Sequence, residues 1–174
     1  MKTIIVAYDR LRTIGKDGDI PWRGTLPVDM EFFRASTVHQ PVVMGRKTYE
    51  SIPERFRPLP ERMNIVMSLS ARAIEGATVA RSLDEAYELA SGSPTIIGGS
   101  DVYSQALPTV DRILATEIDT ETAGGDAFFP ELPDNMWKET ARRPFEANVN
   151  NAYNGAFVLY MRRGFIQQPL RREK

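Results

Sequence analysis

The chain has 174 residues, of which 42% are hydrophobic and 26% charged, and its formal net charge is −1. This balance is typical of one globular domain, and a charge so near zero gives no field that would attract nucleic acid or an anionic membrane. The absence of cysteine excludes disulfides and thiolate chemistry, and the single histidine, His39, excludes a His-rich metal site. We therefore expect a cytoplasmic protein without a metal site, a membrane-spanning segment or a nucleic-acid partner.

Apolar runs that predict strands alternate along the chain with segments that predict helices. In chain order the predicted elements are a strand at 3–8, a loop at 12–22, a helix at 27–38, a strand at 41–44, a helix at 46–52, a proline-rich loop at 53–62, strands at 63–68 and 77–80, a helix at 82–91, a strand at 94–97, a helix at 100–107, and strands at 111–119 and 155–163. The helix at 82–91 has the clearest start, since Ser82 and Glu85 have the spacing of a capping box.

This alternation predicts an α/β fold. We expect a single domain over residues 1–164, with a mostly parallel central β-sheet of about eight strands, an antiparallel edge and about four flanking helices. The remaining residues, 165–174, form a polar and basic tail that we expect to be flexible.

Two strand-to-helix junctions have the features of anion sites. At the first, the strand at 41–44 ends at Gly45, and Arg46, Lys47 and Thr48 begin a helix. A helix N-terminus offers free N–H groups and the positive end of a dipole, and arginine can bind a phosphate through two parallel hydrogen bonds. An ordinary strand-to-helix turn with surface cations would explain the same residues.

The second junction has two adjacent glycines, Gly98 and Gly99, after the strand at 94–97. Glycine permits the close approach of a ligand, although a tight turn capped by Ser100 is an alternative explanation. Neither junction matches the G-x-G-x-x-G fingerprint, so a nucleotide would have to be held by two separate loops.

Other loops supply further candidates. Ser68 and Arg81, near the ends of two other strands, are candidates for phosphate or ribose contacts, although surface polarity explains either residue alone. The loop at 12–22 contains Ile14 and Gly15 and is a candidate to close over a site. Its KDGD segment has too few regularly spaced oxygens for a calcium loop.

Asp29 is a carboxylate among apolar and aromatic residues at a helix start. An acid there complements the helix dipole, which is one sufficient explanation. However, Phe33 lies four residues on and shares its face, and an acid beside an aromatic ring can recognise a flat heterocycle. An apolar setting should raise the pKa of the Asp29 carboxyl and suit it to proton chemistry. One acid, two phosphate-like loops and aromatics together indicate a reductase whose cofactor carries the redox chemistry.

The ordered motifs resemble those of the dihydrofolate reductase family, from residue 3 to residue 163. The matching residues are Ile14-Gly15, Ile20-Pro21-Trp22, Leu26-Pro27-x-Asp29, Phe33, the run from Pro41 to Ile52, Arg57-Pro58-Leu59-Pro60, Arg62, Asn64, Ile97-Gly98-Gly99, Val102-Tyr103 and Thr116-x-Ile118. Each motif is weak alone, but the ordered set is specific.

The resemblance implies NADPH-dependent reduction of 7,8-dihydrofolate to tetrahydrofolate, with hydride transfer to pterin C6 and protonation at N5, in support of one-carbon metabolism and thymidylate synthesis. Asp29, matching the family's acid, would bind the pterin amino edge and N3 and help N5 to gain a proton through water. Arg62 would bind the glutamate α-carboxylate. The residues implied to bind substrate are Ile5, Val6, Asp29, Phe33, Ile52, Arg57, Leu59, Arg62 and Thr116.

The implied cofactor is NADPH. Arg46 would bind the 2′-phosphate, and Gly98 and Gly99 match a pair that a cis peptide joins in the family. Trp22 and Tyr103 would lie near the nicotinamide and complete, with Asp29, the implied catalytic residues. The residues implied to contact the cofactor are Ala7, Ile14, Gly15, Gly45, Arg46, Lys47, Thr48, Ser68, Leu69, Arg81, Ile97, Gly98, Gly99, Ser100, Asp101, Val102 and Tyr103.

The chain departs from the family pattern in three places. Asp101 stands where bacterial members often have arginine, which implies weaker binding of a cofactor phosphate there. Residues 23–25 lengthen the link between Trp22 and Leu26, and residues 53–56 lengthen the loop before Arg57.

Three alternatives stand beside this interpretation. The nearest is the pyrimidine-type reductase of riboflavin synthesis, which has the same fold, but Leu26-Pro27-x-Asp29 together with Arg62 argues against it. A non-catalytic nucleotide- or folate-binding module would bind without turnover. A structural or interaction protein has only the basic tail in its favour. We expect a monomer with dihydrofolate as its small-molecule partner and no obligate protein partner.

Overall fold

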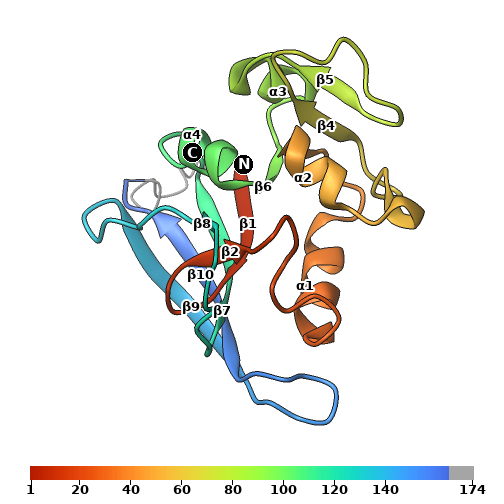
Figure 1. Cartoon of the computed structure of the whole chain (residues 1–174). Coiled ribbons are helices and arrows are strands. Elements are labelled where there is room, and N and C mark those ends of the chain that lie inside the picture. Colours follow the sequence, from red (N-terminus) through yellow and green to blue (C-terminus); the bar gives the residue numbers. More distant parts are fainter. Residues whose placement is uncertain (165–174) are drawn as a thin grey trace.

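An eight-stranded β-sheet runs through residues 1–164, the part of the chain that this computed structural model describes (Figure 1). In spatial order its strands are β5 (Thr78–Ala80), β4 (Asn64–Met67), β3 (Val42–Gly45), β6 (Thr95–Gly98), β1 (Thr3–Tyr8), β7 (Arg112–Ile118), β10 (Gly155–Arg162) and β9 (Trp137–Phe145). The strands from β5 to β7 are parallel, and β10 is antiparallel to both β7 and β9. The predicted α/β class with an antiparallel edge is confirmed, and the tail at 165–174 lies outside the described residues.

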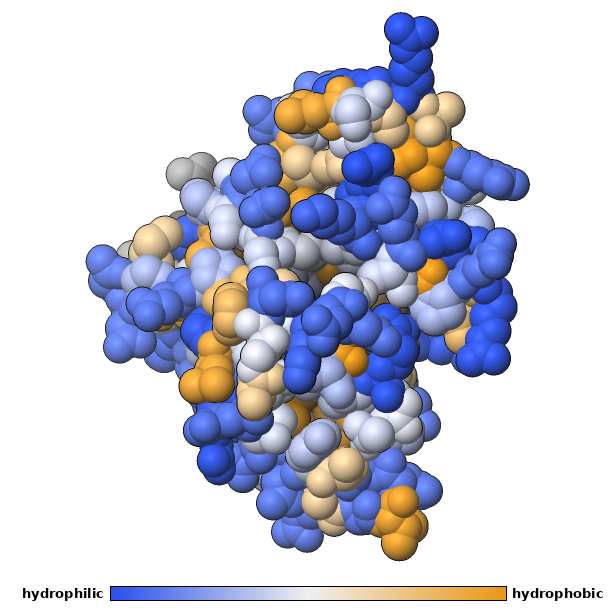
Figure 2. Space-filling model, in the orientation of Figure 1, coloured by the Kyte–Doolittle hydropathy of each residue, from blue (hydrophilic) through white to orange (hydrophobic). Residues whose placement is uncertain are grey.

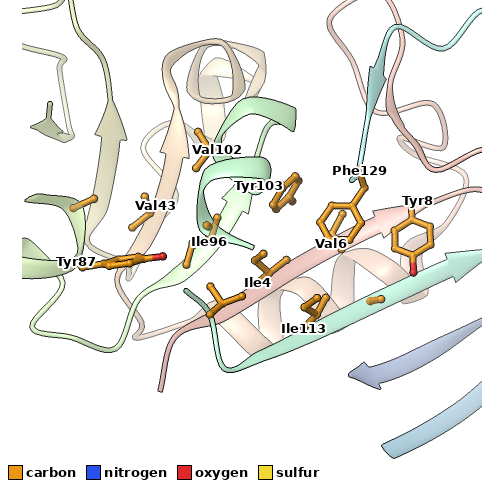
Figure 3. Close-up of a cluster of buried hydrophobic side chains, with 14 of the residues drawn as sticks. Ile4, Val6, Tyr8, Val43, Tyr87, Ile96, Val102, Tyr103, Ile113 and Phe129 are labelled. Atoms are coloured by element: carbon orange, nitrogen blue, oxygen red, sulfur yellow. The ribbon is translucent and has the colours of Figure 1, made fainter. Parts of the chain in front are cut away.

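Helices cover both faces of the sheet. They are α1 (Pro27–Thr37), α2 (Arg46–Ser51), α3 (Leu83–Leu89) and α4 (Ser100–Ala106), with a 3₁₀ turn, η1 (Glu54–Phe56). Successive strand residues point to opposite faces. Val43 accordingly packs in a cluster with α3 and α4, whereas its neighbours Val42 and Met44 pack against Tyr49 of α2. Figure 3 shows the first of these clusters, in which Val43, Ile96 and Val102 come together from β3, β6 and α4.

The strand order reverses at the centre of the sheet. After β1 the chain builds β3, β4 and β5 outward, then returns with β6 between β3 and β1. Parallel strands end at the same edge of a sheet, and ligands of open α/β sheets bind there, where the strand order reverses. The predicted glycine junctions lie at the ends of β3 and β6, which are adjacent strands.

Some elements differ from the prediction. The segment 137–145 is a nine-residue strand, β9, although most of its residues are exposed and polar. It is an edge strand, so charged side chains and Pro144 are tolerated where an apolar run is absent. Part of the predicted loop at 12–22 is the short strand β2 (Thr13–Gly15), which pairs with β8 (Ala127–Phe128).

The predicted capping box at α3 is half formed. Ser82 Oγ accepts a hydrogen bond from the Glu85 N–H at 3.1 Å, as expected. The Glu85 carboxylate, however, accepts from the N–H of Arg81 at 2.6 Å instead of from Ser82. The Glu85 side chain therefore binds the backbone one residue earlier than the motif predicts, at Arg81 instead of at Ser82.

The surface in the orientation of Figure 2 is mostly hydrophilic, with hydrophobic residues in separate patches. Across residues 1–164, none of the helices has both the length and the apolar character needed to cross a membrane.

Candidate active site

The acid Asp29 is buried at the start of α1. Pro27 is the first helical residue, and Leu26 before it packs with Trp22 and Ile118 on the α1 side of the sheet. This anchoring fixes the first turn, and only 9% of the Asp29 surface is exposed. The charge complements the helix dipole, but dipole interactions alone do not require such burial.

Burial raises the pKa of the Asp29 carboxyl above its ordinary value. The Thr116 hydroxyl and the Trp22 indole face the carboxyl and lower its pKa, but their effect is smaller than that of burial. Trp22 Nε1 is itself buried and has no hydrogen-bond partner within residues 1–164. The acid, the hydroxyl and the unpaired indole N–H therefore form one polar group in an apolar surrounding.

The two glycine junctions lie side by side. Gly98 and Gly99 are joined by a cis peptide bond, and Met44 of β3 is in register with Gly98. A Cβ on Gly99 would lie 3.2 Å from Thr48 Oγ1, and one on Gly45 would lie 3.2 Å from a Val102 methyl carbon. The two junctions thus form one glycine cradle, packed so closely against Thr48 and Val102 that a side chain at either glycine would force its neighbour to shift.

The Tyr103 side chain packs directly against Gly98. Its hydroxyl donates a hydrogen bond to the Ile5 carbonyl at 2.8 Å, and its ring packs edge-on against Phe129 (Figure 3). Gly98 has a φ of +106°, and a Cβ there would lie 2.8 Å from the Tyr103 ring. Burial, with a smaller contribution from Asp29, raises the pKa of Tyr103 above its ordinary value. The phenol therefore stays protonated, and its O–H group donates to the backbone of β1.

Two predicted cations lie on the exposed first turn of α2. Arg46 and Lys47 are both exposed, and Arg46 Nε lies 3.7 Å from Glu50 Oε1 one turn further on. So long and exposed an ion pair is weak, so the Arg46 guanidinium is available to an anion.

Ser68, Leu69 and Arg81 come together beyond the ends of β4 and β5. The Arg81 guanidinium donates to the Ser68 carbonyl at 2.7 Å, and Ser68 Oγ accepts from the Ala71 N–H at 3.1 Å. Leu69 beside them is 87% exposed. This is an open surface on which an apolar side chain and a cation are adjacent.

The start of α4 is tied to β8. Ser100 Oγ accepts a hydrogen bond from the Phe128 N–H at 3.0 Å. Asp101 is exposed in the first turn of α4, where its charge complements the dipole, and Ile97 before the glycines is half-buried. The carboxylate of Asp101 therefore adds negative charge beside the glycine cradle.

The predicted carboxylate-binding residue, Arg62, lies over the ring of Phe33, with its guanidinium carbon 5.8 Å from the ring centroid. Burial and the nearby Arg34 lower the pKa of Arg62, and its Nε is buried without a hydrogen-bond partner in the described chain. A buried, unpaired guanidinium N–H is suited to bind a carboxylate.

Other predicted substrate residues have clear structural roles. Ile52 and Leu59 pack beside Tyr49, and Arg57 donates to the Glu50 carbonyl at 2.8 Å. On β1, the Val6 side chain belongs to the cluster with Val102 and Tyr103 of α4 (Figure 3), whereas its neighbour Ala7 packs on the other face of the sheet with Trp22 and Leu26. The sequence assignment of a substrate contact to Val6 can therefore apply only to its backbone.

Ile5 and Ala7, which alternate with Val6, lie on the α1 face of the sheet. Ala7 packs in the cluster that holds Trp22 and Leu26.

The loop with Ile14 and Gly15 is held against residues 122–128. The Gly15 carbonyl accepts from the Asp126 N–H at 3.0 Å, and the Asp126 carboxylate accepts from the Asp17 N–H at 2.9 Å. Lys16 Nζ donates to the Ala123 carbonyl at 2.9 Å. The loop thus has a defined docking surface beside the cradle.

The sequence model of the dihydrofolate reductase family matches residues 1–162. The chain belongs to the dihydrofolate reductase family. This match favours a dihydrofolate reductase over the pyrimidine-type reductase considered from the sequence, and it identifies the chain as an oxidoreductase.

Individual dihydrofolate reductases match most of the chain. The type 3 enzyme of Salmonella typhimurium is 42% identical over 163 residues, 92% of this chain and 97% of that protein. The dihydrofolate reductase of Bacillus subtilis is 37% identical, covering 92% and 94%. That of Mycobacterium tuberculosis is 45% identical over 141 residues, 79% and 84%. The solved dihydrofolate reductase from Enterococcus faecalis, complexed with NADP(H) and a further ligand, has a TM-score of 0.84 at 36% identity, covering 94% and 96%.

Two residues near the candidate site had no assigned role from the sequence. The Asn64 side chain accepts from the Leu59 N–H and donates to the carbonyls of Leu59 and Arg62, which fixes the loop that carries Arg62. Asp126 holds the 13–17 loop, as described above. Asn64 was recognised as part of a motif, but only the fold shows which backbone groups these two side chains reach.

Proposed function

We propose that the protein reduces 7,8-dihydrofolate to 5,6,7,8-tetrahydrofolate with NADPH, and that Asp29 binds the pterin and favours its protonation. The observation that carries this proposal is the buried Asp29 carboxyl, which faces Thr116 and Trp22 in a chain that belongs to the dihydrofolate reductase family. The reaction would serve one-carbon metabolism and thymidylate synthesis in the cytoplasm, with the protein acting as a monomer.

Asp29 is suited to hold a pterin by its amino edge and N3. A carboxylate accepts two hydrogen bonds from such an edge, and Thr116 beside it keeps the carboxyl oriented. Phe33 shares the helix face of Asp29, so its ring lies where the flat part of the ligand would pack. Ile5, Ile52 and Leu59 supply the apolar lining.

Arg62 would bind the α-carboxylate at the other end of the substrate. Its unpaired, buried Nε and its place over Phe33 support this role. Arg57, which donates to the Glu50 backbone, would add only a distant positive charge.

The glycine cradle fits a dinucleotide. The two glycine junctions end adjacent parallel strands, at the edge where open α/β sheets bind ligands, and the related Enterococcus faecalis enzyme was solved with NADP(H). When bound, NADPH supplies the hydride. Gly45, Thr48, Gly98 and Gly99 would hold its pyrophosphate region.

The surface beyond β3, β4 and β5 would bind the adenosine end of the cofactor. Arg46 would take the 2′-phosphate, and Ser68, Leu69 and Arg81 would contact the adenosine. Lys47 would add positive charge nearby, and the loop at Ile14 and Gly15 would cover the nicotinamide.

Proton transfer at N5 would depend on the polar group around Asp29. Because burial raises the pKa of Asp29, the carboxyl gives up its proton less readily than an exposed aspartic acid as the pH rises. Trp22 Nε1, a buried donor without a partner in residues 1–164, is placed to hold a water molecule between the acid and the pterin. The Tyr103 hydroxyl donates its hydrogen bond to the Ile5 carbonyl, so Tyr103 would shape the nicotinamide pocket rather than exchange protons.

The test is the oxidation of NADPH by purified protein with dihydrofolate as the acceptor. We expect turnover that requires both compounds, and tetrahydrofolate as the product. Binding of both without turnover would support a non-catalytic binding module and contradict the proposal.

A further inference from the structure

The first turn of α1, which carries Asp29, has no capping side chain of its own. The N-cap residue is Leu26, which has no side-chain oxygen and is only 1% exposed because it belongs to the apolar cluster with Trp22. Ser, Thr, Asp or Asn usually stands at this position and accepts a hydrogen bond from a first-turn N–H. Pro27 has no N–H, and the Asp29 N–H donates to the Leu26 carbonyl at 3.1 Å. The N–H of Val28 is therefore left to be satisfied from elsewhere.

The missing cap comes from the connection between β9 and β10. Asn151 Oδ1 accepts a hydrogen bond from the Val28 N–H at 3.1 Å, across 123 residues of sequence. In the same connection, the Ala152 N–H donates to the Thr25 carbonyl at 2.8 Å. One turn of the β9–β10 connection thus forms hydrogen bonds both to the lengthened segment after Trp22 and to the first turn of α1.

That turn is internally ordered by Asn148. Asn148 Oδ1 accepts from the N–H groups of Asn150 and Asn151 at 2.8 and 3.1 Å, and from Asn151 Nδ2 at 3.4 Å. The Asn148 N–H donates to the Asn151 carbonyl at 2.8 Å. Because the Asn151 amide nitrogen is directed to Asn148, its oxygen is directed to Val28.

We infer that Asn151 is a positioning residue for Asp29: through the Val28 N–H, it fixes the first turn of α1 and so the place of the catalytic carboxyl. Asp29 directly follows Val28, so a shift of this turn moves the carboxyl relative to the pterin. Side chains that hold a reacting group in place can matter as much as the group itself, since small displacements reduce the rate strongly. This inference rests on the proposed function.

The surroundings of Asp29 predict how a displaced carboxyl would change the pH dependence of the reaction. The side chains that face the carboxyl are Thr116 on β7, Trp22 in the preceding loop and Tyr103 on α4, and none of them carries a charge at neutral pH. Burial therefore decides the direction of the pKa shift. A loosened first turn would admit water and move the apparent pKa of the reaction downward.

The experiment compares Asn151→Ala with Asn150→Ala, an exposed neighbour whose side chain makes no hydrogen bond within residues 1–164. We expect Asn151→Ala to lower kcat/KM for dihydrofolate about tenfold, with an unchanged KM for NADPH and a lower apparent pKa. Asn151→Asp keeps an accepting oxygen and should restore kcat/KM to within about twofold of the native value. Asn150→Ala should match the native protein.

Hydrogen exchange of residues 26–32 gives a readout that does not depend on activity. The Val28 amide should exchange faster in Asn151→Ala and at the native rate in Asn150→Ala. If Asn151→Ala does not fold, Asn148→Ala is the second variant. It removes the acceptor of the Asn150 and Asn151 N–H groups and of Asn151 Nδ2, so it loosens Asn151 but keeps its accepting oxygen, and it should show the same changes in weaker form.

The possible failures are distinguishable. If the native protein does not turn over dihydrofolate, the proposed function is wrong. Hydrogen exchange of the Val28 amide would then still test whether Asn151 caps the first turn of α1. Active native protein with Asn151→Ala indistinguishable from Asn150→Ala in kcat/KM, pH profile and exchange would overturn this inference. A lowered melting temperature with native kinetics and pH profile would do the same, since it would show a purely structural role.

Discussion

Asp29 lies at a helix N-terminus and is also buried, and these two features act on the pKa of its carboxyl in opposite directions. The helix dipole favours the ionised form, and burial favours the neutral form. The pKa is raised, so burial decides the outcome. In the proposed reaction, the same carboxyl would accept the pterin edge when it is ionised, and it holds a proton at a higher pH than an exposed aspartate.

Replacing Asp29 with asparagine should remove most activity and keep the fold. We expect kcat/KM for dihydrofolate to fall about 100-fold or more at neutral pH, which is typical for loss of a proton-transfer group. The deficit should shrink as the pH falls, because solvent then protonates the substrate. Unfolding stability at neutral pH should be unchanged or higher, since the amide does not carry the burial penalty of a charge. Steady-state kinetics against pH and denaturant titration measure both effects.

The control for that variant is Glu31→Gln, which neutralises an exposed acid on the same helix. It should retain native kinetics. Full activity of Asp29→Asn near neutral pH would show that Asp29 has been given the wrong role.

Gly98 should tolerate no side chain. Its φ of +106° is in a region that favours glycine, and a Cβ would overlap the Tyr103 ring at 2.8 Å. Tyr103 cannot turn aside freely, because its hydroxyl is bonded to the Ile5 carbonyl. We expect Gly98→Ala to lower the free energy of unfolding by about 3 kcal/mol, measured by urea titration.

Gly92→Ala separates the two causes. Gly92 also has a positive φ, +81°, but none of the described atoms lies within 4 Å of its Cβ position. This variant should lose only about 1 kcal/mol from backbone strain. Equal losses in both variants would show that the Tyr103 overlap has no effect.

At the scale of elements, the sequence pattern predicted correctly those strands and helix ends that depend on one physical cause. The apolar runs of β1, β3 and β4 and the Ser82 cap of α3 follow from burial and local hydrogen bonding, and the structure confirms them. The strand β9 gave no such signal, because an exposed edge strand has no buried face to pattern.

The candidate site likewise contains residues that a local sequence rule could place and residues that only the fold brings together. The i,i+4 rule placed Phe33 on the face of Asp29, but no local rule could bring Thr116, Trp22 or Asn151 to it. Family resemblance named Thr116 and Trp22 as site residues. It did not name Asn151, whose hydrogen bond to Val28 depends on how the β9–β10 connection folds in this chain.

The junction between β3 and α2 should decide which nicotinamide cofactor is used. Arg46 is exposed and its contact with Glu50 is long, so Arg46→Ala should change stability by less than about 0.5 kcal/mol. We expect the KM for NADPH to rise at least about tenfold, and the KM for NADH to change by less than about twofold, because a charged hydrogen bond to a phosphate contributes about 1.5–3 kcal/mol. Arg55→Ala, at an exposed arginine of η1, is the control. Equal effects on both cofactors would refute the phosphate assignment.

At the scale of the whole molecule, one carboxylate connects four strands on the face of the sheet opposite to α1. Glu117 of β7 accepts hydrogen bonds from Tyr8 of β1 at 2.9 Å and from Tyr160 of β10 at 2.5 Å. Its other oxygen accepts from Arg142 of β9 at 2.8 Å. Thr116 next to it points to the Asp29 side, so β7 contributes to the site with one residue and to the stability of the antiparallel edge with the next.

These contacts predict a loss of stability in alkali. Burial and the hydrogen bond to Glu117 raise the pKa of Tyr160 to about 12, and burial raises that of Tyr8 as well. A phenol whose pKa is higher in the folded state stabilises that state fully below its unfolded pKa of about 10, and the contribution is lost as the pH rises through the folded pKa. The free energy of unfolding should therefore fall between pH 10 and 12, by about 1 kcal/mol for the partly exposed Tyr160.

Tyr160→Phe tests the assignment, because it removes one of these titrating groups. The variant should be less stable than native at neutral pH, since Glu117 loses a hydrogen bond, but its stability should fall less steeply between pH 10 and 12. Tyr153→Phe is the matched control, since the Tyr153 hydroxyl forms no hydrogen bond within residues 1–164, and it should leave both the neutral stability and the slope unchanged. Dihydrofolate turnover should survive in Tyr160→Phe, because the Glu117 contacts lie on the opposite face of β7 from Asp29. A slope in Tyr160→Phe equal to the native slope would show that other groups cause the alkaline transition.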